Sequence, residues 1–135
     1  MYVSEVNIRV RYNETDQMGY VHHANYACFY ELGRTELFRK IGFPYSELEK
    51  SGVMLPVFSL KVNYLKPAFY DEKITIKTYL RKMPKVKLMF DYEIFNEKGI
   101  LLNTGETSLA FINKETRIVM RAPQFLLNYF TKYFE

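Results

Sequence analysis

The 135-residue sequence predicts one α+β domain, residues 1–135, in which an antiparallel sheet of five or more strands wraps around a long central helix and a further helix closes the chain. Alternating apolar and polar residues indicate one strand before residue 12 and four more after residue 53. Between them, residues 25–41 have the apolar pattern of a helix of roughly four to five turns. The later strands are joined by connections too short for parallel crossovers, so the sheet is antiparallel.

The overall composition narrows the class of protein. Apolar residues make up 48% and aromatic residues 17%, which indicates a folded globular chain. The net charge of +4 is too small to indicate nucleic-acid binding and suits an anionic small molecule or an acidic carrier protein. With one cysteine, no signal peptide and no membrane-spanning run, we expect a cytoplasmic protein that does not insert into membranes.

The central helix is expected to begin at Asn25, a common N-cap residue, and to stop at Gly42. Apolar residues cover most of its circumference, which predicts a helix buried inside the sheet. Cys28 lies within this pattern, so a packed, unreactive thiol is favoured over a nucleophile. In the tail, Pro123 is expected at the first position of the closing helix.

The strands are expected to present one face to this helix and a polar face to solvent. In the strand of residues 3–12, the inward side chains are those of Val6, Ile8 and Val10. After a short helical turn near residues 46–49, the next strand is expected to point toward the helix with Phe58, Leu60, Val62 and Tyr64. For Phe58 and Tyr64, a position in the core is favoured over contact with a substrate.

One stretch, residues 12–34, holds most of the reactive side chains. Asp16 follows the first strand in a loop that leads to the start of the central helix. The free amides of a helix N-terminus carry partial positive charge and can hold a polarised carbonyl oxygen, so a carboxylate beside them indicates hydrolytic chemistry. An ordinary loop or capping carboxylate is the alternative for Asp16.

Other residues of this stretch have structural explanations. Glu31 and Arg34 are three apart on the helix, which favours an ion pair between them over a second catalytic acid. His22 and His23 do not indicate a metal site, because adjacent histidines are expected to point in different directions and the chain has no other histidine.

One stretch of about twenty residues contains a dense motif of Asp16, Gly19, Val21, His23, Asn25, Tyr26, Glu31 and Arg34. This motif and the order of elements resemble the hotdog-fold thioesterases of the 4-hydroxybenzoyl-CoA thioesterase-like branch, which includes the acyl-CoA thioesterase of the Tol-Pal gene cluster. The resemblance continues through the segments VNYLKPAFYDEKITI and RIVMRAP and covers nearly the whole chain. One departure is His22, where the family usually has an aromatic residue, and no role is assigned to it.

The resemblance implies an acyl-CoA thioesterase. Asp16 would act as nucleophile or general base, His23 would lie next to the reacting centre, and the substrate would also contact Gly19, Asn25, Tyr26 and Phe58. Basic residues would bind the CoA phosphates, with candidates Lys66, Arg81 and Lys82 and, less directly, Lys61 and Lys85. No metal or cofactor is implied, because coenzyme A is part of the substrate.

The resemblance also implies that the protein forms homo-oligomers. Members of the family work as homodimers, commonly paired into homotetramers, with two sheets joined edge to edge and the active site at the subunit boundary. Two alternatives remain open for the function. The substrate could be an acyl group on an acyl carrier protein, which has the same pantetheine arm and would be attracted by a basic surface. The second alternative is a non-catalytic module that binds acyl-CoA.

Overall fold

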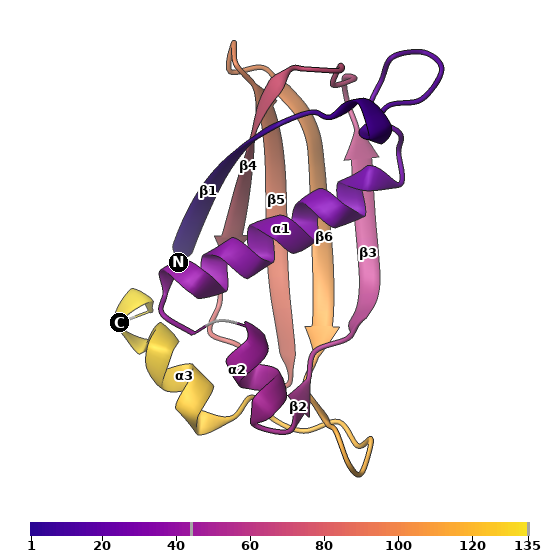
Figure 1. Cartoon of the computed structure of the whole chain (residues 1–135). Helices are drawn as coiled ribbons and strands as arrows, with labels where there is room; N and C mark the ends of the chain where they lie inside the picture. The colour runs from indigo at the N-terminus through magenta and orange to yellow at the C-terminus, as the bar shows by residue number, and fades with distance from the viewer. Residues whose placement is uncertain (44, 135) are drawn as a thin grey trace.

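In the computed structural model, which describes residues 1–43 and 45–134, a five-stranded antiparallel sheet curls around the central helix α1, Asn25–Lys40 (Figure 1). The strand order is β1-β4-β5-β6-β3. Their bounds are β1 Tyr2–Arg9, β3 Val57–Tyr64, β4 Lys73–Leu80, β5 Lys87–Asn96 and β6 Leu101–Ala110. The prediction of an antiparallel sheet around one long helix is confirmed.

The shorter elements lie at the two ends of the sheet (Figure 1). A 3₁₀ turn, η1 (Tyr12–Glu14), follows β1 at the end where α1 begins. At the opposite end lie α2 Tyr45–Lys50, β2 Val53–Met54, β7 Ile112–Asn113, α3 Gln124–Phe130 and η2 Thr131–Tyr133. Within the described residues, no helix is both long and apolar enough to cross a membrane.

The core lies between α1 and the concave face of the sheet. Alternate residues of β4 and β5 point inward and are buried, as their sequence pattern predicts: Ile74, Ile76, Thr78, Leu80, Leu88, Phe90, Tyr92 and Ile94. From the helix, Tyr30, Leu37 and Phe38 are fully buried against them. α1 ends where expected, because Gly42 adopts the left-handed conformation (φ 92°) that terminates many helices.

One side of α1 is exposed, contrary to the prediction of a helix buried all round. Ala27, Cys28 and Glu31 face solvent in the single chain. The expectation of a packed Cys28 thiol is therefore wrong. The sequence pattern misled because the apolar residues of this face are small, and the sheet curls around only part of the helix.

The edge strand β3 also departs from its predicted pattern. Its pairing with β6 shifts between Val57 and Ser59, which is typical of a β-bulge. The bulge turns Phe58 away from the helix, so that its ring is 54% exposed and lies 5.6 Å from Nζ of Lys87 on the outer face. Tyr64 does face the helix but is also 54% exposed, so neither aromatic residue belongs to the core.

The helix approaches the sheet most closely at two glycines. A Cβ atom at Gly105 of β6 would lie 2.4 Å from the ring of Tyr30, and one at Gly33 would lie 2.3 Å from Oγ1 of Thr78. Tyr30 in turn stacks on Tyr92, with 4.2 Å between ring centroids. The missing side chain of Gly105 thus makes room for the tyrosine pair at the centre of the core.

We expect Gly105→Ala to destabilise the fold by about 1–3 kcal/mol, because a methyl group would overlap the Tyr30 ring. Urea unfolding measures this change. In a Tyr30→Leu background the ring is gone and the same substitution should cost less. Equal costs in the two backgrounds would contradict the close contact as the cause.

Candidate active site

Asp16 lies in a tight turn that it holds together with its own side chain. Its Oδ1 accepts hydrogen bonds from the amides of Met18 (2.9 Å) and Tyr20 (3.2 Å). Its backbone amide donates to the Tyr20 carbonyl at 2.8 Å, and its carbonyl accepts from the amide of Gly19 at 3.0 Å. Gly19 has a φ of 80°, which a residue with a side chain rarely adopts. One carboxylate oxygen therefore fixes the turn.

Backbone pairing attaches this turn to the rest of the fold. Thr15 pairs with Val21 across the base of the turn, and Tyr20 pairs with Phe69. The amide of Val21 donates to the carbonyl of Ala68 at 2.8 Å. Asp16 is thereby held beside the segment that connects β3 to β4.

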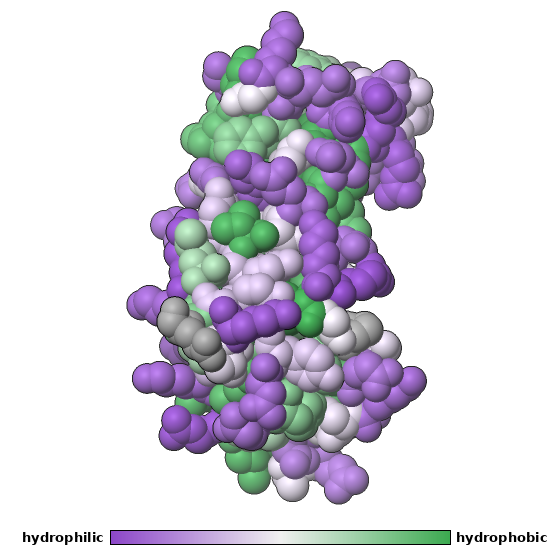
Figure 2. Space-filling model, turned by 90° about the vertical axis from the view of Figure 1, so that its left-hand side faces the viewer, coloured by the Kyte–Doolittle hydropathy of each residue, from purple (hydrophilic) through white to green (hydrophobic). Residues whose placement is uncertain are grey.

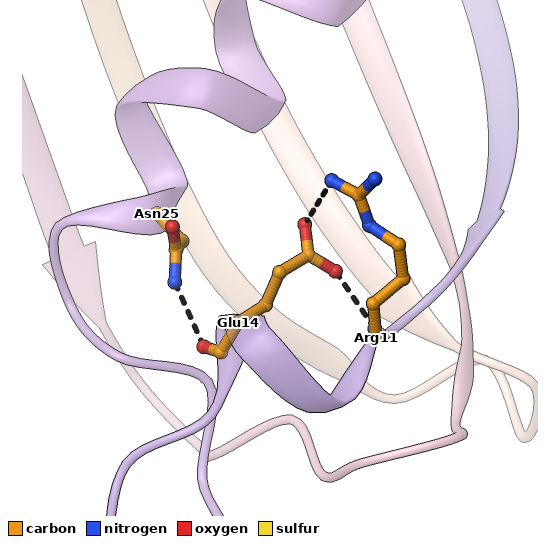
Figure 3. Close-up of polar contacts among 3 residues, drawn as sticks. All are labelled: Arg11, Glu14 and Asn25. Carbon is orange, nitrogen blue, oxygen red and sulfur yellow. Dashed lines mark hydrogen bonds and ion pairs between the residues drawn. The ribbon is translucent and has the colours of Figure 1, made fainter.

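A second acidic residue, Glu14, connects the end of β1 to the start of α1 through its side chain and its backbone carbonyl (Figure 3). Its Oε1 accepts the amide of Arg11 at 2.7 Å and its Oε2 accepts the Arg11 guanidinium at 3.2 Å. The backbone carbonyl of Glu14 accepts both the His22 amide and Nδ2 of Asn25, each at 2.8 Å. Only 8% of Glu14 is exposed.

This arrangement corrects the predicted role of Asn25. The N-cap position belongs to Ala24, whose side chain makes no cap, and Asn25 is the first residue of α1. Its side chain instead bonds the Glu14 carbonyl. Its amide donates to His22 at 2.9 Å, whereas the amide of Tyr26 lies 3.5 Å from the carbonyl of His23, longer than an ordinary hydrogen bond. The Tyr26 amide is thus nearly free.

These elements enclose a cavity of about 300 Å³ at the start of α1. It is lined by Asp16, Met18, Tyr20, Val21, His23, Tyr26, Tyr64, Leu65, Lys66 and Pro67. Tyr64 donates its hydroxyl to the His23 carbonyl at 3.1 Å, and its ring lies 5.4 Å from that of Tyr26. An acidic residue, the first turn of α1 and apolar side chains therefore border one space, a combination that suits attack on a polarised carbonyl.

The structure brings some predicted site residues together and separates others. Asp16, His23, Tyr26 and Lys66 share the cavity, while Gly19 and Asn25 support its walls. Phe58 lies on the outer face of the sheet, outside this cavity. Arg81 and Lys82 follow the end of β4 that pairs with Tyr2, the far end of the sheet. Arg81 is also paired with Asp91 at 2.6 Å.

The two histidines do not diverge as predicted. Their rings stack with 4.2 Å between centroids, and Nδ1 of His22 accepts the Ala24 amide at 3.1 Å. Both residues are exposed, and His23 lines the cavity. In the part of the chain that the structure describes, no three His, Cys, Asp or Glu side chains gather as a metal site would require.

Arg34 also differs from its prediction, because it forms no ion pair with Glu31 in the described structure. Glu31 is exposed, whereas Arg34 is 6% exposed and donates from Nη1 to the Tyr92 hydroxyl at 3.2 Å. That hydroxyl lies 2.6 Å from Oγ1 of Thr107. Burial raises the pKa of Tyr92 to about 12, so the hydroxyl stays protonated at neutral pH.

Sequence reasoning missed Glu14 and Tyr64 as parts of the site. Glu14 is two residues before Asp16, in a stretch that looked like an ordinary polar loop. Tyr64 was placed on the correct face of its strand, but its position beside the helix start depends on which strand forms the sheet edge. Sequence spacing carries no signal for that order.

We expect Glu14→Ala to lower stability by about 1–3 kcal/mol, because the partly buried hydrogen bonds from the Arg11 amide and guanidinium would lose their acceptor. Glu14→Gln keeps an acceptor oxygen and should cost less. Urea unfolding of both variants measures the difference. Identical stability of Glu14→Ala and the wild type would refute the proposed role of this carboxylate.

The chain was compared with known proteins. Residues 10–130 match the family model of the thioesterase-like superfamily. YneP of Bacillus subtilis is named an acyl-CoA thioesterase by inference. It is 41% identical to this chain, over 86% of this chain and 84% of its own length. YbgC of Escherichia coli, named an acyl-CoA thioester hydrolase, is 35% identical over 78% of this chain and 79% of its own.

A solved structure agrees with these relatives. The DHNA-CoA thioesterase of Staphylococcus aureus superposes with a TM-score of 0.91 and is 41% identical, covering 98% of this chain and 89% of its own. The sheet wrapped around α1, the cavity at the helix start and the match over residues 10–130 lead to the same conclusion. The chain belongs to the thioesterase-like superfamily and has the hotdog fold of its thioesterases.

Proposed function

We propose that this protein hydrolyses acyl-CoA thioesters to a free acid and coenzyme A. The observation that carries the proposal is that Asp16 lines the same cavity as Tyr26, whose amide makes only a long hydrogen bond of 3.5 Å. The names of YneP, YbgC and the Staphylococcus aureus enzyme support the same substrate class.

The two oxygens of Asp16 have different tasks in this mechanism. Oδ1 holds the turn, so the other oxygen is the reactive one. It either attacks the thioester carbonyl carbon or takes a proton from a water that attacks it. The Tyr26 amide donates to the oxyanion that forms. Expulsion of the CoA thiolate gives the acid directly in the second route, or an anhydride that water then cleaves in the first.

The remaining predicted residues assist this step. His23 orients the site, because its carbonyl accepts the Tyr64 hydroxyl while its ring borders the cavity. Gly19 and Asn25 fix the turn and the helix start. Lys66 is the best-placed cation for a CoA phosphate, because it lines the cavity. Arg81, Lys82 and Phe58 have weaker support, since the structure places them away from it.

A homodimer is part of the proposal. The edge strand β3 and the residue after it expose the apolar side chains of Val57 (44%), Leu60 (48%), Tyr64 (54%) and Leu65 (53%). A long exposed apolar edge invites pairing with another strand. On the opposite side of the molecule, at the β1 edge, apolar residues are scattered among hydrophilic ones (Figure 2). β3 is therefore the edge that suits a second copy, and two such dimers would form a tetramer.

A cytoplasmic location completes the proposal. The single cysteine excludes an internal disulfide, and Cys28 is exposed as a free thiol. No cofactor enters the mechanism, because the substrate itself carries coenzyme A.

Asp16→Asn tests the reaction and the residue together. Asparagine keeps the Oδ1 acceptor for Met18 and Tyr20, so the turn and the fold should persist. We expect turnover to fall by at least about 100-fold. Thiol release from short, long, branched and aromatic acyl-CoAs measures the effect in both proteins. Undiminished turnover by a folded Asp16→Asn variant would refute the mechanism.

The same assay separates the two alternatives. Faster hydrolysis of an acyl group on acyl carrier protein than on CoA would identify a carrier-protein thioesterase. Tight acyl-CoA binding without thiol release by the wild type would identify a binding module.

Leu60→Lys tests the dimer. Leu60 lies near the middle of β3, so a two-fold strand pair would bring the new lysines close to each other and to Lys61 of the partner subunit. We expect dissociation to the 16.2 kDa monomer in sedimentation equilibrium. Met89→Lys, at an equally exposed position on the outer face of β5, is the matched control and should leave assembly unchanged. A wild-type protein that sediments as a monomer would contradict the proposal.

A further inference from the structure

His22 binds two of the four backbone amides at the start of α1. Its carbonyl accepts the amide of Asn25 at 2.9 Å, and Nδ1 of its ring accepts the amide of Ala24 at 3.1 Å. The amide of Tyr26 makes only its long bond of 3.5 Å, and the amide of His23 has no backbone acceptor among the described residues. One residue thus determines which donors of the helix start remain for a ligand.

Only two contacts of His22 depend on its side chain. Its backbone bonds, to the Glu14 carbonyl and from the Asn25 amide, are open to almost any residue. The ring adds the Nδ1 acceptor for Ala24 and a stack on the ring of His23, with 4.2 Å between centroids and 27° between the ring planes. The mechanism above uses neither contact, although His23 lines the cavity at the start of α1.

The Nδ1 bond takes the place of the side-chain cap that α1 lacks. Ala24 occupies the N-cap position without a polar side chain, and Asn25 turns its side chain to the Glu14 carbonyl. A side-chain acceptor at this place fixes the first turn of a helix, where backbone amides have no partner within the helix. The stack on His23 holds the imidazole from one side, so the ring keeps the orientation in which Nδ1 meets the Ala24 amide.

We propose that His22 is a positioning residue for the hydrolysis, and that its imidazole holds the first turn of α1 so that the amides of His23 and Tyr26 keep one orientation beside the cavity. Donors that are fixed in advance stabilise an oxyanion best, because they need no reorganisation when the charge forms. The inference rests on the proposed acyl-CoA hydrolysis and adds a residue that the mechanism leaves without a task.

The bond requires one form of the imidazole. Nδ1 accepts a hydrogen bond only in the neutral ring whose proton is on Nε2. An imidazolium carries a proton on both nitrogens and would also place a positive charge at the positive end of the helix dipole. We therefore expect NMR of the ring nitrogens at neutral pH to show an unprotonated Nδ1 and a protonated Nε2 in His22.

Two substitutions separate the acceptor from the ring. His22→Phe keeps an aromatic ring for the stack on His23 but has no acceptor for the Ala24 amide. His22→Asn loses the ring, but its Oδ1 can accept the amide two residues on, as asparagine does in turns. Comparing the two variants shows which of the two ring contacts matters.

We expect His22→Phe to lower kcat by roughly 3- to 10-fold, the value of about one hydrogen bond, while KM changes by less than about 2-fold. KM should change little because the cavity walls that contact the substrate are intact. His22→Asn should recover most of the kcat that His22→Phe loses. Thiol release from the best substrate of the acyl-CoA panel measures both constants, and urea unfolding verifies that the variants are folded.

Hydrogen exchange of the Ala24 amide follows the same bond without any turnover. We expect this exchange to be roughly 3- to 10-fold faster in His22→Phe than in the wild type or in His22→Asn. The amide of Val21, which donates to the Ala68 carbonyl at 2.8 Å, is the internal control and should exchange equally in all three proteins.

The outcomes separate this inference from the proposed function. Wild-type kcat in a folded His22→Phe variant, a His22→Asn variant no faster than His22→Phe, or a proton on Nδ1 at neutral pH would each overturn the inference and leave the hydrolysis intact. A loss of kcat without faster exchange of the Ala24 amide would also overturn it. Absence of hydrolysis of any acyl-CoA by the wild type would instead overturn the proposed function, and the role of His22 in it.

Discussion

The contact between Tyr30 and Gly105 sets how closely α1 can approach the sheet. A residue with a side chain at position 105 would collide with the Tyr30 ring, so the helix rests directly on the backbone of β6. Tyr30 then stacks on Tyr92 and fixes the helix along its axis. Because α1 begins at the cavity that holds Asp16, this core contact also determines where the Tyr26 amide lies relative to the carboxylate. The chemistry at one end of the helix depends on packing at its middle.

The loop before α1 is positioned by polar contacts instead of apolar packing. The carboxylate of Glu14 binds Arg11, and its carbonyl binds Asn25. Asp16 uses one oxygen in the same way, to hold its own turn. Such bonds fix position with few buried atoms, so the site stays open to a ligand. Because the Asp16 carboxylate also shapes its loop, it cannot rotate freely, and its second oxygen keeps one direction.

The sequence predicted the architecture because strand alternation and helical periodicity follow from burial on one face. The sequence-based prediction failed where a local backbone feature turns a side chain to the other face while the alternating residue pattern continues. The bulge before Ser59 turned Phe58 outward, although the alternating pattern continued. Spacing suggested an ion pair for Arg34, but its actual partner, Tyr92, comes from a distant strand. Asp16 and His23 were found through a motif, whereas Glu14 and Tyr64 needed the fold to show what they contact.

Arg34 places a charged group in the core, next to the inner face of the sheet. A buried guanidinium whose described polar contact is a neutral hydroxyl is costly to fold, and apolar replacement would remove that cost. Its retention in the core is explained if the charge is needed at a cavity wall. β3 has a cavity at each end, lined by Tyr64 at one end and by Val57 at the other. Both cavities therefore belong to the single chain, and the same edge strand supports them at its two ends.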